Sequence, residues 1–152
     1  MKILAVDATG EVLSVAVGRH ELRRAAKKHD EALLPLVERL LKKAGLGWKD
    51  LDAIAAASGP GRFTGIRIGM SFAAAAGFQL KIPALAINRL AAAAGRSKAD
   101  RVLGALPGWK DEVYSQEYRK GKARGAAAWT APKEWPTLRR AAEADGLEVS
   151  FG

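Results

Sequence analysis

The sequence predicts an α/β protein built on a mixed β-sheet. Short apolar runs with the length of strands alternate with longer segments whose apolar residues recur every three or four positions, as on one face of a helix. The 152 residues are 49% hydrophobic, which is enough for a packed core and argues against a disordered chain. The polar segment GRSKAD at 95–100 divides a first domain, 1–98, from a shortened second domain, 99–152.

The chain opens with strands. The segment KILAVDATGEVLSVAVG predicts two strands joined by a turn at 8–11. Its continuous apolar run at 3–6 is typical of a buried central strand, whereas residues 12–17 alternate in part. The charged segment HELRRAAKK predicts a third strand that lies at the edge of the sheet with its charges outward.

A first helix is predicted from Asp30 to Gly45. Asp30 is a typical N-cap residue, and Gly45 is a natural residue after a last helical turn. Pro35 is compatible with a helix only near its first turn. The wide apolar stripe indicates a helix covered on two sides, and it comprises Leu33, Leu34, Leu36, Val37, Leu40, Leu41 and Ala44.

The later segments continue the alternation. LDAIAAAS predicts a short buried strand, and the glycine-rich stretch SGPGRFTGIRIG leads into a helix from about Thr64 to Leu80. IPALAI predicts a strand and 89–95 a short helix. Beyond them come two strand segments with a turn at Gly121, a helix in PKEWPTLRRAAEAD and a last strand in LEVSF. Each part therefore opens with strands and continues into a helix, which is a weak structural echo.

Composition and charge limit the classes of function. The absence of cysteine excludes disulfides, thiolate catalysis and cysteine-ligated metals. The net charge of +9 is compatible with contact with RNA or an acidic partner, but we favour a solvated basic surface because the sequence has no long Lys/Arg block. The longest apolar run, 68–80, is shorter than the roughly 20 residues that span a bilayer, and the N-terminus does not resemble a signal peptide. We expect a soluble cytoplasmic protein.

The glycine-rich stretch does not match the known phosphate-binding patterns. Thr64 follows Gly59 by five positions, and Ile66 follows Gly61 by five, where a P-loop requires Gly-Lys. A dinucleotide fingerprint fails as well, because its third glycine would fall on Thr64. Two interpretations remain: a tight strand-to-helix turn, which we favour, or an anion site at the start of the helix with Thr64 as its cap and help from Arg62.

The helix after this stretch carries a strip of small residues. Gly65, Gly69, Ala73 and Gly77 recur every four positions and allow another helix to approach closely. Glycine inside a helix costs up to about 1 kcal/mol relative to alanine, so these positions need a compensating contact. The strip predicts an interface with another subunit, and internal packing against the 33–44 helix is the alternative.

The same residues carry a resemblance to a known family. SGPGRFTGIRIG resembles the signature of the bacterial TsaB (YeaZ) family, and ILAVDATGEVLSVAV together with KKHDEALLPLVERLLKKAGLGWKDLDAIAAASGPG is similar to the family's first hairpin, helix and strand. The resemblance is strong over 1–95 and weak beyond. The sequence departs from the family pattern at Arg62, where serine is usual, at the DAT of 7–9, and in stopping at Gly152.

The resemblance implies an actin/sugar-kinase/Hsp70-like (ribonuclease H-like) fold with a truncated second domain. It also implies a non-catalytic subunit that binds and activates TsaD, with a TsaE-type ATPase, in threonylcarbamoylation of the adenosine beside the tRNA anticodon. Members form homodimers in isolation, and tRNA contact within the complex is conceivable. We expect the dimer or TsaD interface at Leu33, Leu36, Val37, Leu40, Gly65, Ile66, Gly69, Met70, Ala73, Ala76 and Gly77.

Catalysis and cofactors are not expected. Candidates for anion or phosphate contact are Asp7, Thr9, Gly10, Gly59, Gly61, Arg62 and Thr64. His20 and His29 are nine positions apart, which does not suit a helical metal pair, and we expect both at the surface.

The alternatives are a kinase or acyl-phosphate hydrolase of the same superfamily that uses Asp7, and a small RNA-binding module. The latter would use the basic and aromatic residues Trp109, Lys110, Tyr114, Tyr118, Arg119, Lys120, Lys122, Arg124 and Trp129.

Overall fold

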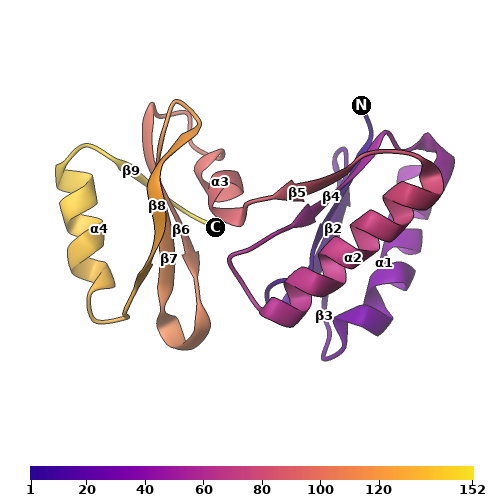
Figure 1. The fold of residues 1–152 in the computed structure, drawn as a ribbon, viewed down its shortest axis with the longest axis horizontal. Helices are drawn as coiled ribbons and strands as arrows, with labels where there is room; N and C mark the ends of the chain where they lie inside the picture. Colours follow the sequence, from indigo (N-terminus) through magenta and orange to yellow (C-terminus); the bar gives the residue numbers. More distant parts are fainter. The chain divides into compact units, whose positions relative to one another are not determined.

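The computed structural model describes residues 1–152, except for the side chain of Trp109. The proposed RNA-facing role of Trp109 therefore lies outside the described residues. The chain divides into two compact units, Met1–Ile87 and Asn88–Gly152 (Figure 1). Each unit contains one mixed sheet and its own helices, as the α/β prediction requires.

The sheet of the first unit has five strands in the order β3-β2-β1-β4-β5. These are β1 (Ile3–Asp7), β2 (Val12–Val17), β3 (His20–Ala25), β4 (Ala53–Ala57) and β5 (Ala84–Ile87). The first three form an antiparallel meander, while β4 pairs parallel to β1 and β5 parallel to β4. The prediction of a central first strand and a charged edge strand is confirmed, because β1 is paired on both sides and β3 on one.

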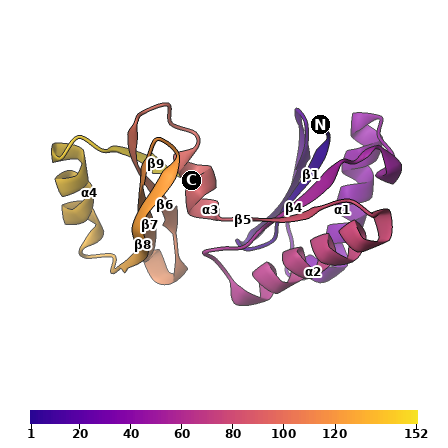
Figure 2. The same cartoon turned by 45° about the horizontal axis from the view of Figure 1, so that its top comes forward.

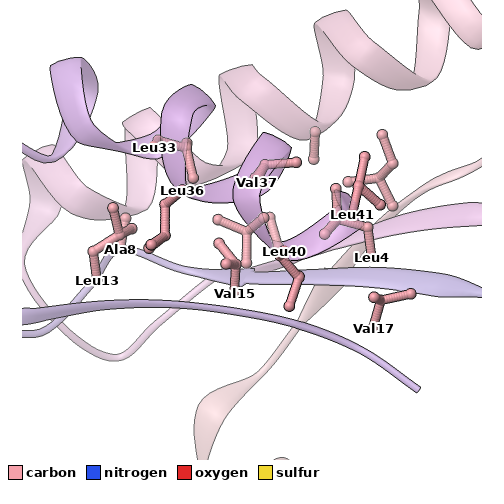
Figure 3. Packing of buried hydrophobic residues seen from close by; sticks show 14 of the residues in the cluster. Leu4, Ala8, Leu13, Val15, Val17, Leu33, Leu36, Val37, Leu40 and Leu41 are labelled. Carbon is pink, nitrogen blue, oxygen red and sulfur yellow. The ribbon is translucent and has the colours of Figure 1, made fainter. Parts of the chain in front are cut away.

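Two helices cover one face of this sheet (Figures 1 and 2). They are α1 (His29–Ala44) over β2 and β3, and α2 (Phe63–Leu80) over β4 and β5, with a short 3₁₀ turn, η1 (Trp48–Asp50), after α1. Alternate residues of the central strands, such as Leu4 and Val6, point to the helices and are fully buried. Figure 3 shows α1 leucines packed on these strands. No helix among the described residues is long and apolar enough to cross a membrane.

The starts of both helices differ from the prediction. Helix α1 begins at His29 with Lys28 as N-cap, and α2 begins at Phe63 with Arg62 as N-cap. Neither cap side chain makes a capping hydrogen bond to a backbone N–H of its helix, and Asp30 and Thr64 lie in the first turns instead of capping them. Gly45 does end α1 in the left-handed conformation that was predicted.

The second unit repeats the strand order of the first. Its sheet runs β8-β7-β6-β9, with β6 (Arg101–Pro107), β7 (Val113–Arg119), β8 (Lys122–Thr130) and β9 (Glu148–Phe151). As in β3-β2-β1-β4, a three-stranded meander is followed by a helix, α4 (Trp135–Ala144), and a parallel strand. A second 3₁₀ turn, η2 (Trp109–Asp111), precedes β7. The structural echo seen in the sequence is therefore a repeated topology.

Helices α3 (Arg89–Ala94) and α4 pack on opposite faces of the second sheet. The Ser150 hydroxyl donates to the Ala93 carbonyl of α3, while the neighbouring Phe151 ring packs against Trp135 of α4 at 6.0 Å between centroids. Because successive strand residues point to opposite faces, the two contacts place the helices on either side (Figure 1).

The division between units falls between Ile87 and Asn88, not at the predicted 98/99. Helix α3 belongs to the second unit because Leu90 and Ala94 share its core with Val102, Leu106 and Tyr118. The polar segment at 95–100 is thus a connection inside the second unit. Its polarity reflects exposure at a helix-to-strand turn and does not mark a domain boundary.

Candidate functional site

The glycine-rich stretch is a strand-to-helix turn that packs against the turn between β1 and β2. The Arg62 N–H donates to the Thr9 carbonyl at 2.8 Å. A Cβ on Gly61 would lie 2.7 Å from the Thr9 Cβ, and a Cβ on Gly65 would overlap the Ala8 carbonyl. Only glycine fits at these close approaches. The spacing of the two glycines is therefore explained by the packing of α2 onto the first hairpin.

Hydrogen bonds between Asp7 and Thr9 stabilise the turn between β1 and β2. The Asp7 carboxylate accepts from the Thr9 N–H at 2.9 Å and from the Thr9 hydroxyl at 2.6 Å. Thr9 is 1% exposed. These hydrogen bonds are typical of an Asx-type turn. Part of the hydrogen-bonding capacity of the Asp7 carboxylate is thus used inside the turn.

His29 ties helix α1 to the same turn. His29 is 8% exposed, and its two ring nitrogens lie 3.0 Å from the Ala8 carbonyl oxygen and 3.2 Å from the Glu11 carbonyl oxygen. The expectation that His29 is a surface residue is therefore wrong. Sequence reasoning missed this contact because its partners are backbone atoms about twenty residues earlier, which leave no signal in residue types.

A depression of about 490 Å³ opens where the first turns of α1 and α2 approach Ala8. Lys27, Lys28, Arg62 and Thr64 line it. Lys28 pairs with Glu31 at 2.6 Å, and Arg62 with Glu11 at 3.2 Å. Of the predicted anion-contact residues, two line the depression, while the remaining five form the packed turns: Asp7, Thr9, Gly10, Gly59 and Gly61. Anion binding here stays a prediction.

The small-residue strip of α2 faces the chain's own sheet. A Cβ on Gly69 would lie 3.8 Å from the Ala56 Cβ, and one on Gly77 would lie 3.3 Å from the Ala84 Cβ. The strip is buried, and so are four predicted interface residues of α1, which form the core on β1 and β2 (Figure 3). The interface prediction is thus contradicted for Leu33, Leu36, Val37, Leu40, Gly65, Gly69, Ala73 and Gly77. Small residues are on the inside because they let α2 lie close to an alanine-rich strand.

The opposite face of α2 carries large apolar side chains. Phe63 is 72% exposed and Phe78 is 87% exposed. The Arg67 guanidinium lies 5.6 Å from the Phe63 ring centroid. We call this surface the outer face of α2, and it comprises Phe63, Arg67, Ser71, Ala74 and Phe78. These residues follow one another at spacings of four, four, three and four positions, so the sequence contains this helical face. The interface was predicted at the strip of small residues instead.

The other predicted interface residues flank this face. Ile66, Met70 and Ala76 are half-buried, and Met70 and Ala76 pack partly against the core. A depression of about 840 Å³ beside Phe78 is lined by Ala74, Lys81 and Pro83 among others. A role for Ile66, Met70 and Ala76 in partner binding stays a prediction.

The chain is similar to known proteins over most of its length. Residues 23–132 match the family model described as TsaD: tRNA N6-adenosine threonylcarbamoyltransferase. The tRNA threonylcarbamoyladenosine biosynthesis protein TsaB of Haemophilus influenzae is 32% identical over 133 residues, which are 82% of this chain and 56% of that protein. The chain thus spans about half the length of the curated relatives it matches.

Solved structures agree with this similarity. YeaZ from Pseudomonas aeruginosa superposes with a TM-score of 0.70 at 36% identity, covering 86% of this chain and 68% of that one. The ethanolamine utilization protein EutJ of Carboxydothermus hydrogenoformans superposes with a TM-score of 0.55 at 15% identity, over 95% of this chain and 57% of that one. The second likeness shows the fold alone, which is the actin/sugar-kinase/Hsp70-like fold that was expected.

Proposed function

This chain belongs to the TsaB (YeaZ) family, and from that membership we propose that it is a non-catalytic subunit in tRNA threonylcarbamoyladenosine biosynthesis. It binds and activates a TsaD-type catalytic subunit, acts with a TsaE-type ATPase, and works in the cytoplasm. The modified base is the adenosine beside the tRNA anticodon.

The observation that carries this proposal is the outer face of α2. Burying a phenylalanine side chain stabilises a complex by about 1.5 to 3 kcal/mol, and this face leaves two of them in water. Residues 63–80 contain no acidic side chain, and Arg67 is their one charged residue. A helix that exposes two phenylalanine side chains and no acidic residue on its outer face, and that packs on a sheet through glycines, suits a protein partner better than solvent.

The proposed partner of this face is the TsaD-type subunit. In isolation a second copy of the chain covers the same face, so the homodimer and the complex with TsaD exclude each other. The packed first turn supports a non-catalytic role, because Asp7 and Thr9 bond to each other at 2.6 Å. Activation then consists of positioning the catalytic subunit through α2.

The test uses the double variant Phe63→Ala/Phe78→Ala. Size-exclusion chromatography with light scattering is run on the chain mixed with the TsaD-type subunit of the same organism. We expect a one-to-one complex with the wild type and at least about tenfold weaker binding by the variant. Trp129→Ala is the matched control, since Trp129 is also large, apolar and 55% exposed but lies in the second unit.

Two results would contradict the proposal. Equal binding by the wild type and the double variant would remove the outer face of α2 as the interface. No complex with the wild type would remove the partner itself. The enzyme alternative would then be tested by equilibrium dialysis against ATP, where saturable binding that Asp7→Ala abolishes would support it.

A further inference from the structure

Three cations lie side by side across the sheet of the second unit. In the strand register Arg101 of β6 is opposite Arg119 of β7, and Arg119 is opposite Lys122 of β8. Residues that are directly opposite on neighbouring strands point to the same face, and the strands are about 4.8 Å apart. We call Arg101, Arg119 and Lys122 the basic row.

The hairpin turn adds charge to the row. Lys120 and Gly121 connect β7 to β8 with positive φ angles of 48° and 73°, as in the tight turns typical of hairpins. Lys120 is therefore at the tip, next to the row. On the same face as the row, Arg124 is opposite Glu117, two positions along the strand from Arg119. The segment 119–124 thus has four cations and no acid.

Two acidic groups near the row, Glu117 and Asp145, are paired with Arg101. Arg101 lies 2.8 Å from the Asp145 carboxylate and 3.5 Å from that of Glu117. Within the described part of the chain, none of the four cations at 119–124 has a carboxylate within 4 Å. All four are exposed. Like charges opposite each other destabilise a sheet, so Arg119 and Lys122 do not serve the stability of this unit.

We propose that the β7–β8 hairpin binds the phosphate backbone of RNA through Arg119, Lys120, Lys122 and Arg124. This inference rests on the proposed function, which supplies tRNA as the RNA. A nucleic-acid strand presents a regular line of negative charges, one per about 3.4 Å of axis, and long flexible cations a strand spacing apart can reach successive phosphates. Arginine adds bidentate bonds to phosphate oxygens.

The proposed contacts are with phosphates, which are alike at every nucleotide and carry no sequence information. Apart from the four cations, residues 119–124 are Gly121 and Ala123, which have no hydrogen-bonding side chain. Binding is therefore independent of sequence and strongly dependent on salt. The hairpin positions the tRNA, and recognition of the modified adenosine is left to other surfaces.

The experiment measures the anisotropy of a fluorescent, unmodified tRNA transcript titrated with the full-length chain at several KCl concentrations. Arg119→Gln/Lys122→Gln/Arg124→Gln removes three charges from the hairpin. The matched control, Lys98→Gln/Lys110→Gln/Lys133→Gln, removes three exposed charges from the same unit outside the hairpin. Because the substitutions remove repulsion between like charges, the melting temperature of the hairpin variant should be unchanged or higher. A loss of tRNA binding then does not result from unfolding.

We expect the hairpin variant to bind tRNA about tenfold or more weakly, with the slope of log affinity against log salt reduced by about 2 to 3, while the control stays close to wild type. Equal losses in both variants would mean that net charge alone attracts RNA, and would overturn the inference. So would a poly-glutamate peptide that binds the hairpin as tightly as tRNA does, since the surface would then take an acidic protein.

The same variants distinguish this inference from the proposed function. The hairpin variant should still form the complex with the TsaD-type subunit, because it leaves α2 intact. If the wild type forms no such complex but the hairpin variant binds tRNA more weakly than the wild type does, the proposed function fails and the RNA-binding surface stands. If the complex forms but the hairpin variant binds tRNA normally, the reverse holds.

Discussion

The same substitution at two glycines of α2 should change stability in opposite directions. In Gly65→Ala the new Cβ would overlap the Ala8 carbonyl oxygen and lie 2.7 Å from the carbonyl carbon, where ordinary contact begins at 3.4 Å. The obstacle is backbone, so α2 must move away from the first turn. In Gly69→Ala the nearest atoms, on Ala56 and Val6, would be 3.8 and 3.9 Å away, which leaves room for the methyl group.

The magnitudes follow from these distances. Overpacking costs about 1 to 3 kcal/mol, and an overlap with backbone lies at the upper end. The gain in helix propensity from glycine to alanine is about 1 kcal/mol, which leaves Gly65→Ala less stable by about 2 kcal/mol. Gly69→Ala keeps that gain without a clash and should be more stable by about 1 kcal/mol. Gly77→Ala, with an oxygen at 3.0 Å, should lie between them.

The assay is urea unfolding followed by far-ultraviolet circular dichroism. Helices α1 and α2 have 16 and 18 residues, against 6 in α3 and 10 in α4, so the signal reports mainly on the first unit. Equal slopes with urea would show that the variants unfold the same surface. A Gly65→Ala variant as stable as the wild type, or a destabilised Gly69→Ala variant, would refute the packing of α2 described above.

Two further predictions concern the first unit. His29→Ala should lower its unfolding free energy by about 1 to 3 kcal/mol and speed amide exchange in the 8–12 segment, because two carbonyl oxygens lose their ring contacts. Unchanged exchange there would show that the ring does not hold the turn. The pKa of Asp50 is lowered from its ordinary 3.8 by the hydrogen bond from the Gly47 N–H and by the charge of Lys2. Since its folded pKa is depressed, its stabilisation is present above about pH 4 and is lost as pH falls through the folded pKa. Asp50→Asn should therefore flatten the acid limb of the stability profile, and parallel profiles would contradict this.

The sequence by itself determined the elements and their order. Every predicted strand and helix is present, because period-two and period-3.6 patterns are local consequences of which residues can be buried together. The charged edge strand β3 and the strand-to-helix turn at the glycines were also local, since they depend on residue type over a few positions.

Tertiary structure alone decided which side of α2 is buried. A helix with glycines on one side and phenylalanines on another is apolar all round, so hydrophobicity does not choose between the sides. The choice depends on how closely a neighbour approaches, and here the Ala8 carbonyl leaves no space for a side chain at Gly65, whereas Ala56 of β4 leaves room for a methyl group at Gly69. The basic row was likewise hidden, because Arg101 and Lys122 become neighbours of Arg119 only through strand register, a property of paired chains.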